Sequence, residues 1–202
     1  MSTTASVSAG DEGASSRFQI LALDGGGAKA LFTAYLLARL EEDLGVSIRD
    51  SFDLIAGTSA GGIVARVWVR ELGGDAQARR VLTLGTPNHG TQVAGAANEL
   101  VPAGCPTACE QLAPDSELLR GLNAGDETPE GPTFVAVWTT LDELVTPPES
   151  AQLDGALNIT VQSVCPRSLV RHGELPEEPA VAAIVVATLG AAAPSVPQAC
   201  PT

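Results

Sequence analysis

A serine among very small residues is the side chain of this sequence best placed to do chemistry. The string Gly57-Thr58-Ser59-Ala60-Gly61 follows an apolar run and precedes an amphipathic one. In a Gly-x-Ser-x-Gly turn between strand and helix the serine occupies a strained corner, and larger neighbours would collide there. The first N–H groups of the following helix point at negative charge forming beside it. An ordinary glycine-rich turn is the alternative, but the position between strand and helix favours Ser59 as an acyl-transfer nucleophile.

A serine nucleophile needs a base, and the chain contains two histidines, His89 and His172. The acidic residues between Ser59 and His89 are Glu71 and Asp75, and the helical pattern carries them away from the turn. His172 lies between the last predicted strand and the last predicted helix, in a loop whose mobility would let the imidazole reach the carboxyl edge of the sheet. We therefore expect His172 to be the general base.

An acid is also required, to orient the imidazole. Asp142 comes just beyond the apolar run 133–138, which gives the order serine, acid, histidine along the chain. We predict that Ser59 attacks the acyl carbon, that His172 takes and returns the proton, and that Asp142 fixes the imidazole tautomer and stabilises its charged form. This chemistry needs no metal and no cofactor. A solvated histidine and a turn-forming aspartate are the plainer interpretations, but their order after the serine turn favours the triad.

Backbone N–H groups are the expected donors to the oxyanion. The first is that of Ala60, and the second comes from Gly25, Gly26 or Gly27, where glycine allows the backbone to approach a reacting carbonyl closely. The same glycines formally match a dinucleotide-binding fingerprint, Gly-x-Gly-x-x-Ala. That alternative is disfavoured because the next strand ends in the serine turn and offers no acid for a ribose.

Strands and helices must alternate along the chain to position these groups. Apolar runs predict strands at 18–23, 52–56, 79–84, 133–138 and 156–164. Apolar residues at helical spacing predict helices at 28–44, 63–72, about 109–122 and 179–189. The alternation predicts a three-layer α/β/α sandwich around a mainly parallel sheet of about five strands, with right-handed crossovers.

The chain divides into a tail and one domain. Residues 1–17 are small and polar and are expected to be disordered. Residues 18–202 are expected to form a single α/β hydrolase domain, in which a loop-rich excursion at about 88–132 supplies a lid or a substrate wall. The apolar run 181–193 is too short to span a bilayer and predicts a buried helix.

The net charge and the cysteine content indicate which binding partners and which cellular compartment to expect. The 202 residues carry a net charge of -13 with only 11 Lys and Arg, which argues against nucleic acid. Residues 1–17 lack the features of a signal peptide, which indicates the cytoplasm. The cysteines predict two disulfides, Cys105 with Cys109 and Cys165 with Cys200, and these would instead favour secretion. Four free thiols remain the alternative.

The parts of the chain before and after the Ser59 turn resemble two different known families. Residues 18–62 resemble the start of patatin-like phospholipases, through Leu23-Asp24-Gly25-Gly26-Gly27-Ala28-Lys29 and Gly57-Thr58-Ser59-Ala60-Gly61-Gly62. In that family the Asp-Gly-Gly-Gly loop forms the oxyanion hole, and a Ser-Asp dyad replaces the triad. The dyad aspartate lies in an Asp-Gly-Gly or Asp-Gly-Ala string, so the resemblance implies Asp154 as an alternative acid, within Asp154-Gly155-Ala156.

Residues 63–190 resemble the second half of actinobacterial α/β-hydrolase triacylglycerol lipases. The matching strings are Val64-Ala65-Arg66, Leu82-Thr83-Leu84-Gly85-Thr86-Pro87-Asn88-His89-Gly90-Thr91, Asp142-Glu143-Leu144-Val145-Thr146-Pro147 and the region around His172. This resemblance implies that Asp142 and His172 complete a triad with Ser59.

Together these observations predict a lipase or esterase acting on acyl lipids or small esters, with at most a peripheral contact with a membrane or lipid interface. The short interval between Asp24 and Ser59 leaves room for one helix and one strand. We therefore expect a reduced sheet with an exposed edge at 18–23. A patatin-like acyl hydrolase and a catalytically silent fold or binding protein are the alternatives.

Overall fold

The computed structural model of the chain describes residues 20–25, 54–76, 78–100, 107–189 and 193–200. Its centre is a sheet of five parallel strands in chain order: β1 (Ile20–Leu23), β2 (Leu54–Thr58), β3 (Arg80–Leu84), β4 (Thr133–Trp138) and β5 (Leu157–Thr160). The predicted parallel sheet of about five strands is confirmed. Among the described residues, β1 forms one edge of the sheet, as expected for the reduced sheet.

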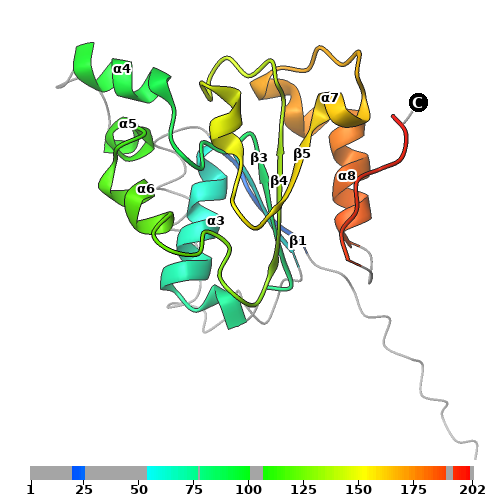
Figure 1. The fold of residues 1–202 in the computed structure, drawn as a ribbon, viewed down its shortest axis with the longest axis horizontal. Coiled ribbons are helices and arrows are strands. Elements are labelled where there is room, and N and C mark those ends of the chain that lie inside the picture. Colours follow the sequence, from blue (N-terminus) through cyan, green and yellow to red (C-terminus); the bar gives the residue numbers. More distant parts are fainter. Residues whose placement is uncertain (1–19, 26–53, 77, 101–106, 190–192, 201–202) are drawn as a thin grey trace, which may run out of the picture.

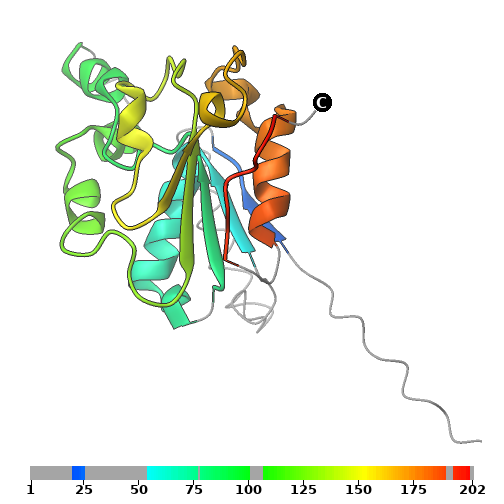
Figure 2. The same ribbon diagram turned by 45° about the vertical axis from the view of Figure 1, so that its right-hand side comes forward.

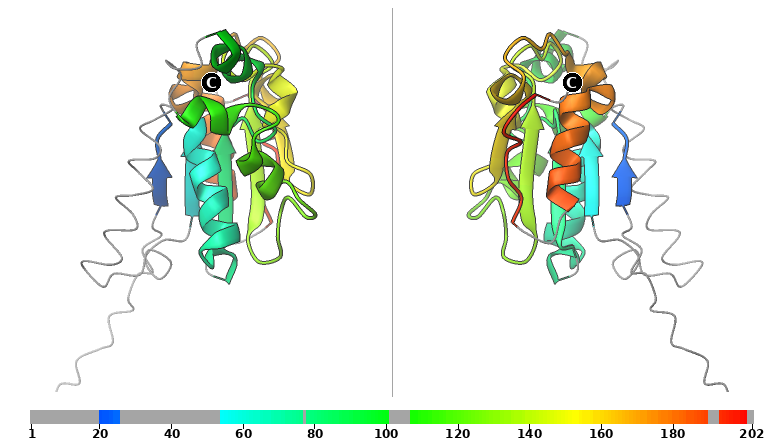
Figure 3. Two further views of the ribbon diagram at one scale, coloured as in Figure 1. Left: turned by 90° about the vertical axis from the view of Figure 1, so that its left-hand side faces the viewer. Right: turned by 90° about the vertical axis from the view of Figure 1, so that its right-hand side faces the viewer.

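Helices cover both faces of the sheet. Helix α3 (Ala60–Glu71) lies on one face and α8 (Pro179–Leu189) on the other (Figures 1 and 3). Alternate strand residues point to opposite faces, so the core has two halves. Leu82 belongs to the core cluster that contains Ile184 of α8, whereas its neighbour Val81 belongs to the cluster that contains Val69 of α3. This arrangement confirms the predicted three-layer α/β/α sandwich.

Helix α3 begins at Ala60, three residues before the predicted start at Ile63. Glycine is a poor helix former, and Gly61 and Gly62 led to the late prediction. Both are nevertheless helical. They are glycines because the first turn of the helix packs so closely against the sheet that side chains would not fit. A Cβ on Gly61 would collide with the carbonyl oxygen of Leu23. Tertiary packing thus overrides local propensity where the helix meets β1.

The excursion after β3 holds three short helices, α4 (Gln92–Leu100), α5 (Thr107–Leu112) and α6 (Glu117–Leu122). They lie on the α3 side of the sheet, away from α8 (Figure 2). The single helix predicted at about 109–122 is wrong because Pro114 separates α5 from α6. Ser116 then starts α6, since its Oγ accepts a hydrogen bond of 3.2 Å from the N–H of Leu119.

A buried arginine of α3 anchors this excursion. The Arg66 guanidinium donates to the Leu122 carbonyl at 3.1 Å and to Asn123 Oδ1 at 2.7 Å, at the end of α6. It also donates to the Asn88 carbonyl at 3.3 Å, in the loop after β3. Burial lowers the pKa of Arg66 to about 10, so the side chain stays protonated at neutral pH. Arg66 lies in one of the lipase-like strings, but no sequence pattern predicts this role for it.

Strand β5 ends at Thr160, four residues before the predicted end at Val164. Thr160 Oγ1 accepts the N–H of Ser163 at 3.1 Å and caps the short helix α7 (Val161–Val164). An apolar run alone does not distinguish this strand-to-helix change. Three single-turn or two-turn 3₁₀ segments complete the described fold, namely η1 (Gly74–Ala76), η2 (Pro148–Ala151) and η3 (His172–Glu177).

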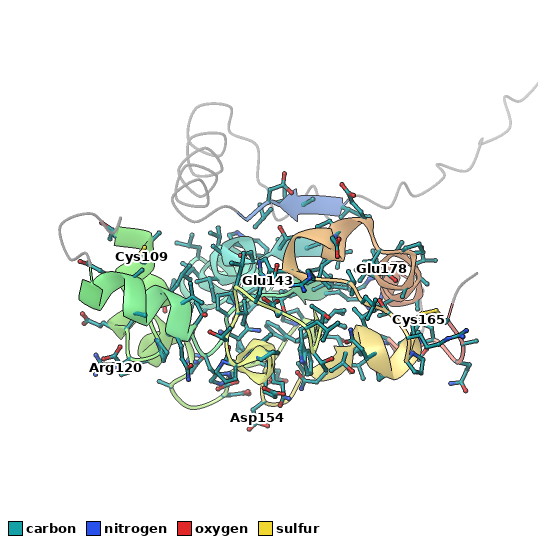
Figure 4. All side chains as sticks on the ribbon, turned by 90° about the horizontal axis from the view of Figure 1, so that it is seen from above. Cys109, Arg120, Glu143, Asp154, Cys165 and Glu178 are labelled. Atoms are coloured by element: carbon teal, nitrogen blue, oxygen red, sulfur yellow. A yellow bond between two sulfur atoms is a disulfide. The ribbon has the colours of Figure 1, made fainter. Side chains whose placement is uncertain are left out.

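The C-terminal segment is held by a disulfide. Cys165 is bonded to Cys200 with a Cα–Cα distance of 4.8 Å, which confirms that predicted pair (Figure 4). Cys109 is also disulfide-bonded, and its predicted partner Cys105 lies outside the described residues. So do the predicted tail 1–17 and the predicted helix 28–44. Among the helices of the described part, none has the length and apolar character needed to cross a bilayer.

The two-sided core predicts which leucines matter for stability. Leu82 is fully buried at the centre of the sheet, whereas the side chain of Leu169 is 79% exposed. We expect Leu82→Ala to lower the free energy of unfolding by about 2–5 kcal/mol, because it leaves a cavity. Leu169→Ala should change it by less than about 0.5 kcal/mol. Urea unfolding of both variants measures this, and equal losses would contradict the described core.

Candidate active site

Ser59 sits at a sharp turn between β2 and α3. Its backbone has φ 50° and ψ −128°, and it is the one non-glycine residue with positive φ in the described part of the chain. The N–H of Ser59 donates to the Leu84 carbonyl at 2.8 Å, and the Ser59 carbonyl accepts the N–H of Gly62 at 3.1 Å. Strained backbone of this kind persists only where surrounding contacts hold it. The structure therefore gives Ser59 the geometry expected of the predicted nucleophile.

Gly25 packs directly against this turn. A Cβ on Gly25 would lie 2.6 Å from the Cβ of Ser59 and 2.7 Å from the carbonyl oxygen of Thr58. The N–H of Gly25 donates to Thr58 Oγ1 at 2.9 Å, so in this structure it is not directed at an oxyanion. Ala60 begins α3, and its N–H therefore has no acceptor within the helix. The other predicted donors, Gly26 and Gly27, lie outside the described residues.

Asp142 and His172 form a buried pair. Asp142 Oδ2 lies 2.7 Å from His172 Nδ1, and the side chains are 0% and 9% exposed. The other carboxylate oxygen accepts the N–H groups of Leu144 at 2.9 Å and Val145 at 2.7 Å. These bonds fix the carboxylate and hence the imidazole plane. With its Nδ1 proton donated to Asp142, His172 has Nε2 available as an acceptor.

The segment that begins at His172 is a 3₁₀ helix, where the sequence predicted a loop. His172 is buried and begins η3, where the N–H of Arg171 donates to Glu174 Oε2 at 2.8 Å. Thr139 links this segment to the aspartate loop, because its Oγ1 donates to the Val170 carbonyl at 2.7 Å. The sequence offered no signal for Thr139, since a threonine after a strand is common.

Ser59 and His172 line the same pocket, whose volume is about 540 Å³. Its other described lining residues are Asp24, Gly25, Thr58, Leu84, Leu144, Gly173, Leu175 and Pro176. No hydrogen bond joins Ser59 to His172 in the described structure, and in unliganded enzymes such bonds often tighten only when substrate binds. The structure thus brings the predicted nucleophile, base and acid to one edge of the sheet.

Asp154 is placed elsewhere. Through the register of β2 to β5, Ala56 lies level with Leu157. Ser59 follows the carboxyl end of β2, whereas Asp154 lies in the turn before β5, and β3 and β4 lie between these two strands. At ~4.8 Å per strand spacing, about three spacings separate the two segments, and Asp154 is not among the residues that line the pocket of Ser59. Seen from above, Asp154 is at the periphery, whereas Glu143, next to the acid of the pair, lies over the centre (Figure 4).

His89, the histidine not favoured by the sequence, is on the surface. Its Nε2 lies 2.7 Å from Glu127 Oε1, and its side chain is 42% exposed. The second carboxylate oxygen of Glu127 accepts the N–H of Asp154 at 2.8 Å. His89 is not among the residues that line the pocket of Ser59.

The fold described here is that of α/β-hydrolase lipases. Lipase B of Aspergillus fumigatus has a TM-score of 0.63 at 18% identity, covering 81% of this chain and 41% of the lipase. Lipase BlEst2 of Bacillus licheniformis, in its mature form, has a TM-score of 0.51 at 15% identity, covering 74% of this chain and 84% of the lipase. At such identities the likeness concerns the fold.

The chain belongs to the patatin-like phospholipase family, whose model matches residues 21–147. It is 56% identical over 48 residues to a cGAMP-activated phospholipase of Pseudomonas aeruginosa, which is 24% of this chain and 14% of that protein. It is 52% identical over 46 residues to the 85/88 kDa calcium-independent phospholipase A2 of Rattus norvegicus, which is 23% of this chain and 6% of that protein. The chain therefore spans a small part of these relatives' length. The mixed resemblance to patatin-like phospholipases and to lipases is confirmed.

Gly85 lies directly beside the Asp142–His172 pair. It follows β3 with φ +53°, and its N–H donates to the Val137 carbonyl at 2.8 Å. A Cβ at this position would lie 2.6 Å from the Cδ1 of Leu175, 3.3 Å from His172 Nδ1 and 3.4 Å from Asp142 Oδ2. No side chain therefore fits between β3 and the pair.

Replacing Gly85 should lower the free energy of unfolding by more than backbone strain alone would. Gly85→Ala places a methyl group against the fully buried Leu175. Gly125→Ala also replaces a glycine of positive φ, +75° against +53° at Gly85, but meets nothing within 4 Å. We expect Gly85→Ala to lose about 1–3 kcal/mol more unfolding free energy than Gly125→Ala. Urea unfolding of both variants gives the comparison. A Gly85→Ala variant no less stable than Gly125→Ala would mean that the pair is not packed on residue 85.

Proposed function

We propose that this protein hydrolyses carboxylic esters of lipids through an acyl-enzyme, with Ser59, His172 and Asp142 as its triad. The proposal rests on the 2.7 Å hydrogen bond between buried Asp142 and His172, because His172 lines the same pocket as the strained Ser59. Nucleophile, base and orienting acid are the three roles that such chemistry requires.

In the acylation step, Ser59 Oγ attacks the carbonyl carbon of the ester while His172 Nε2 takes the hydroxyl proton. The imidazolium is stabilised by Asp142 through Nδ1, and the oxyanion accepts the N–H of Ala60. The tetrahedral intermediate then collapses. The C–O bond to the alcohol breaks, His172 returns its proton to the leaving oxygen, and the acyl group stays on Ser59.

Deacylation repeats these steps with water. His172 takes a proton from the attacking water, whose oxygen bonds to the acyl carbon, and then returns a proton to Ser59 Oγ as the acyl–serine bond breaks. The products are one alcohol and one carboxylic acid. Every proton in both steps passes through the same imidazole, so no metal or cofactor enters the scheme.

The substrate class follows from the walls of the pocket and from the relatives. Leu84, Leu144 and Leu175 give it an apolar side that suits an acyl chain. Membership of a phospholipase family and a lipase-like fold support acyl lipids, with small soluble esters as further substrates. We also infer that the excursion at 88–132 acts as a substrate wall, because Thr91 Oγ1 donates to the carbonyl of Leu144 at 2.6 Å.

A second mechanism is favoured by the family match. Patatin-like enzymes use a Ser-Asp dyad, and Asp154 lies in the string that would supply its acid. Its place before β5, outside the pocket of Ser59, favours the triad instead. Hydrolysis without His172 would therefore need a structure in which Asp154 moves into that pocket.

Single substitutions distinguish the two mechanisms. We expect Ser59→Ala, His172→Ala and Asp142→Asn each to lower kcat/KM for a p-nitrophenyl ester by at least about 10³-fold, because each removes one member of a unit that acts together. Asp154→Asn is the matched control, since it changes a carboxylate outside the pocket and should retain the parent activity. Hydrolysis is followed by release of p-nitrophenol, and circular dichroism checks that each variant folds.

Two outcomes contradict the triad. Loss with Ser59→Ala and Asp154→Asn but not with His172→Ala would establish the dyad. A folded parent that hydrolyses none of a series of esters of different chain length would overturn the enzyme function and leave the silent fold.

A further inference from the structure

Asp24 brings a single carboxylate to the pocket of Ser59. It follows β1, its side chain is exposed to solvent, and it lines the same pocket as Ser59 and His172. The remaining described lining consists of apolar side chains, glycines and the hydroxyl of Thr58, with the imidazole as the one other titratable group. Neither step of the proposed mechanism uses Asp24.

The position of Asp24 beside the serine is fixed by two close contacts. On one side, a Cβ on Gly61 would lie 3.2 Å from the backbone carbonyl carbon of Asp24. On the other side, Gly25 packs against the Cβ of Ser59 and donates its N–H to Thr58 Oγ1. The backbone of Asp24 is therefore held against the serine turn.

The two sides of the nucleophile differ in character. Strand β2 lies between β1 and β3, so Ser59 has the end of β1 on one flank and the end of β3 on the other. The β3 flank carries Leu84, together with Leu175 from η3, whereas the β1 flank carries Asp24. An apolar acyl chain suits the leucine side, which directs the alcohol part of an ester toward Asp24.

We propose that Asp24 is a specificity-determining residue that favours esters whose alcohol carries a positive charge. The inference rests on the proposed function, because it concerns the same pocket and the same nucleophile. A carboxylate near the bound alcohol attracts a cation and repels an anion. The net charge of -13 acts in the same direction on the approach of the substrate.

The test compares two esters of the same acid that differ only in charge. One is the choline ester, and the other is its carbon isostere, in which a neutral tert-butyl group replaces the trimethylammonium group. We expect the parent to show a kcat/KM about three- to tenfold higher for the choline ester at low ionic strength. The ratio should fall toward one in Asp24→Asn and also in the parent as salt is added.

Asp115→Asn is the matched control, because Asp115 is an exposed aspartate in the turn between α5 and α6 and is not part of the pocket lining. It removes the same net charge and should keep the parent ratio. The ratio cancels any general loss of activity in a variant. If Asp24→Asn does not fold, Asp24→Ser is compared with Asp115→Ser in the same way.

A parent ratio of one or less, or a ratio that survives in Asp24→Asn, overturns the role of Asp24 while leaving the proposed ester hydrolysis in place. A folded parent that hydrolyses neither these two esters nor p-nitrophenyl esters overturns both. A ratio lowered equally by Asp24→Asn and Asp115→Asn would trace the preference to net charge and would also contradict a role of Asp24 in the pocket.

Discussion

The positive φ of Ser59 is the constraint on which the rest of the site depends. A residue with a side chain in this conformation costs on the order of 1–3 kcal/mol, and the fold offsets that cost with a backbone hydrogen bond from Ser59 to Leu84. The turn also requires neighbours without side chains, because β1 and the first turn of α3 approach it from two sides. Gly25 and Gly61 meet that requirement, and a Cβ on either would collide with backbone or with the serine.

A parallel sheet explains why groups distant in sequence meet beside this turn. The carboxyl ends of parallel strands share one edge, so the segments after β1, β2, β3 and β4 bring Asp24, Ser59, Gly85 and Asp142 together. His172 comes from beyond β5 and lies over the residue that follows β3, next to its carboxylate partner. Local hydrogen bonds hold these loops. The sheet therefore brings the site residues to one edge, and the loops determine the distances between their side chains.

Much of this arrangement follows from the sequence, and the rest depends on contacts that a sequence does not display. Apolar runs located β3 and β4 within one residue, and apolar residues at helical spacing located α8. The order of serine, acid and histidine indicated which side chains share the edge. The end of β5 depends on one threonine cap, at Thr160, and the early start of α3 on close packing against β1. The burial of His172 and the link from Thr139 to its segment are tertiary features without a local pattern.

If the buried pair activates Ser59, covalent labelling should detect a reactive serine. The measurement is the rate at which a fluorophosphonate modifies the folded protein, read from the intact mass, with the site located by peptide mapping. We expect one label per chain on the peptide that contains Ser59, and a rate that falls by orders of magnitude in His172→Ala. No labelling of the folded parent, labelling at another residue, or an equal rate in His172→Ala would contradict it.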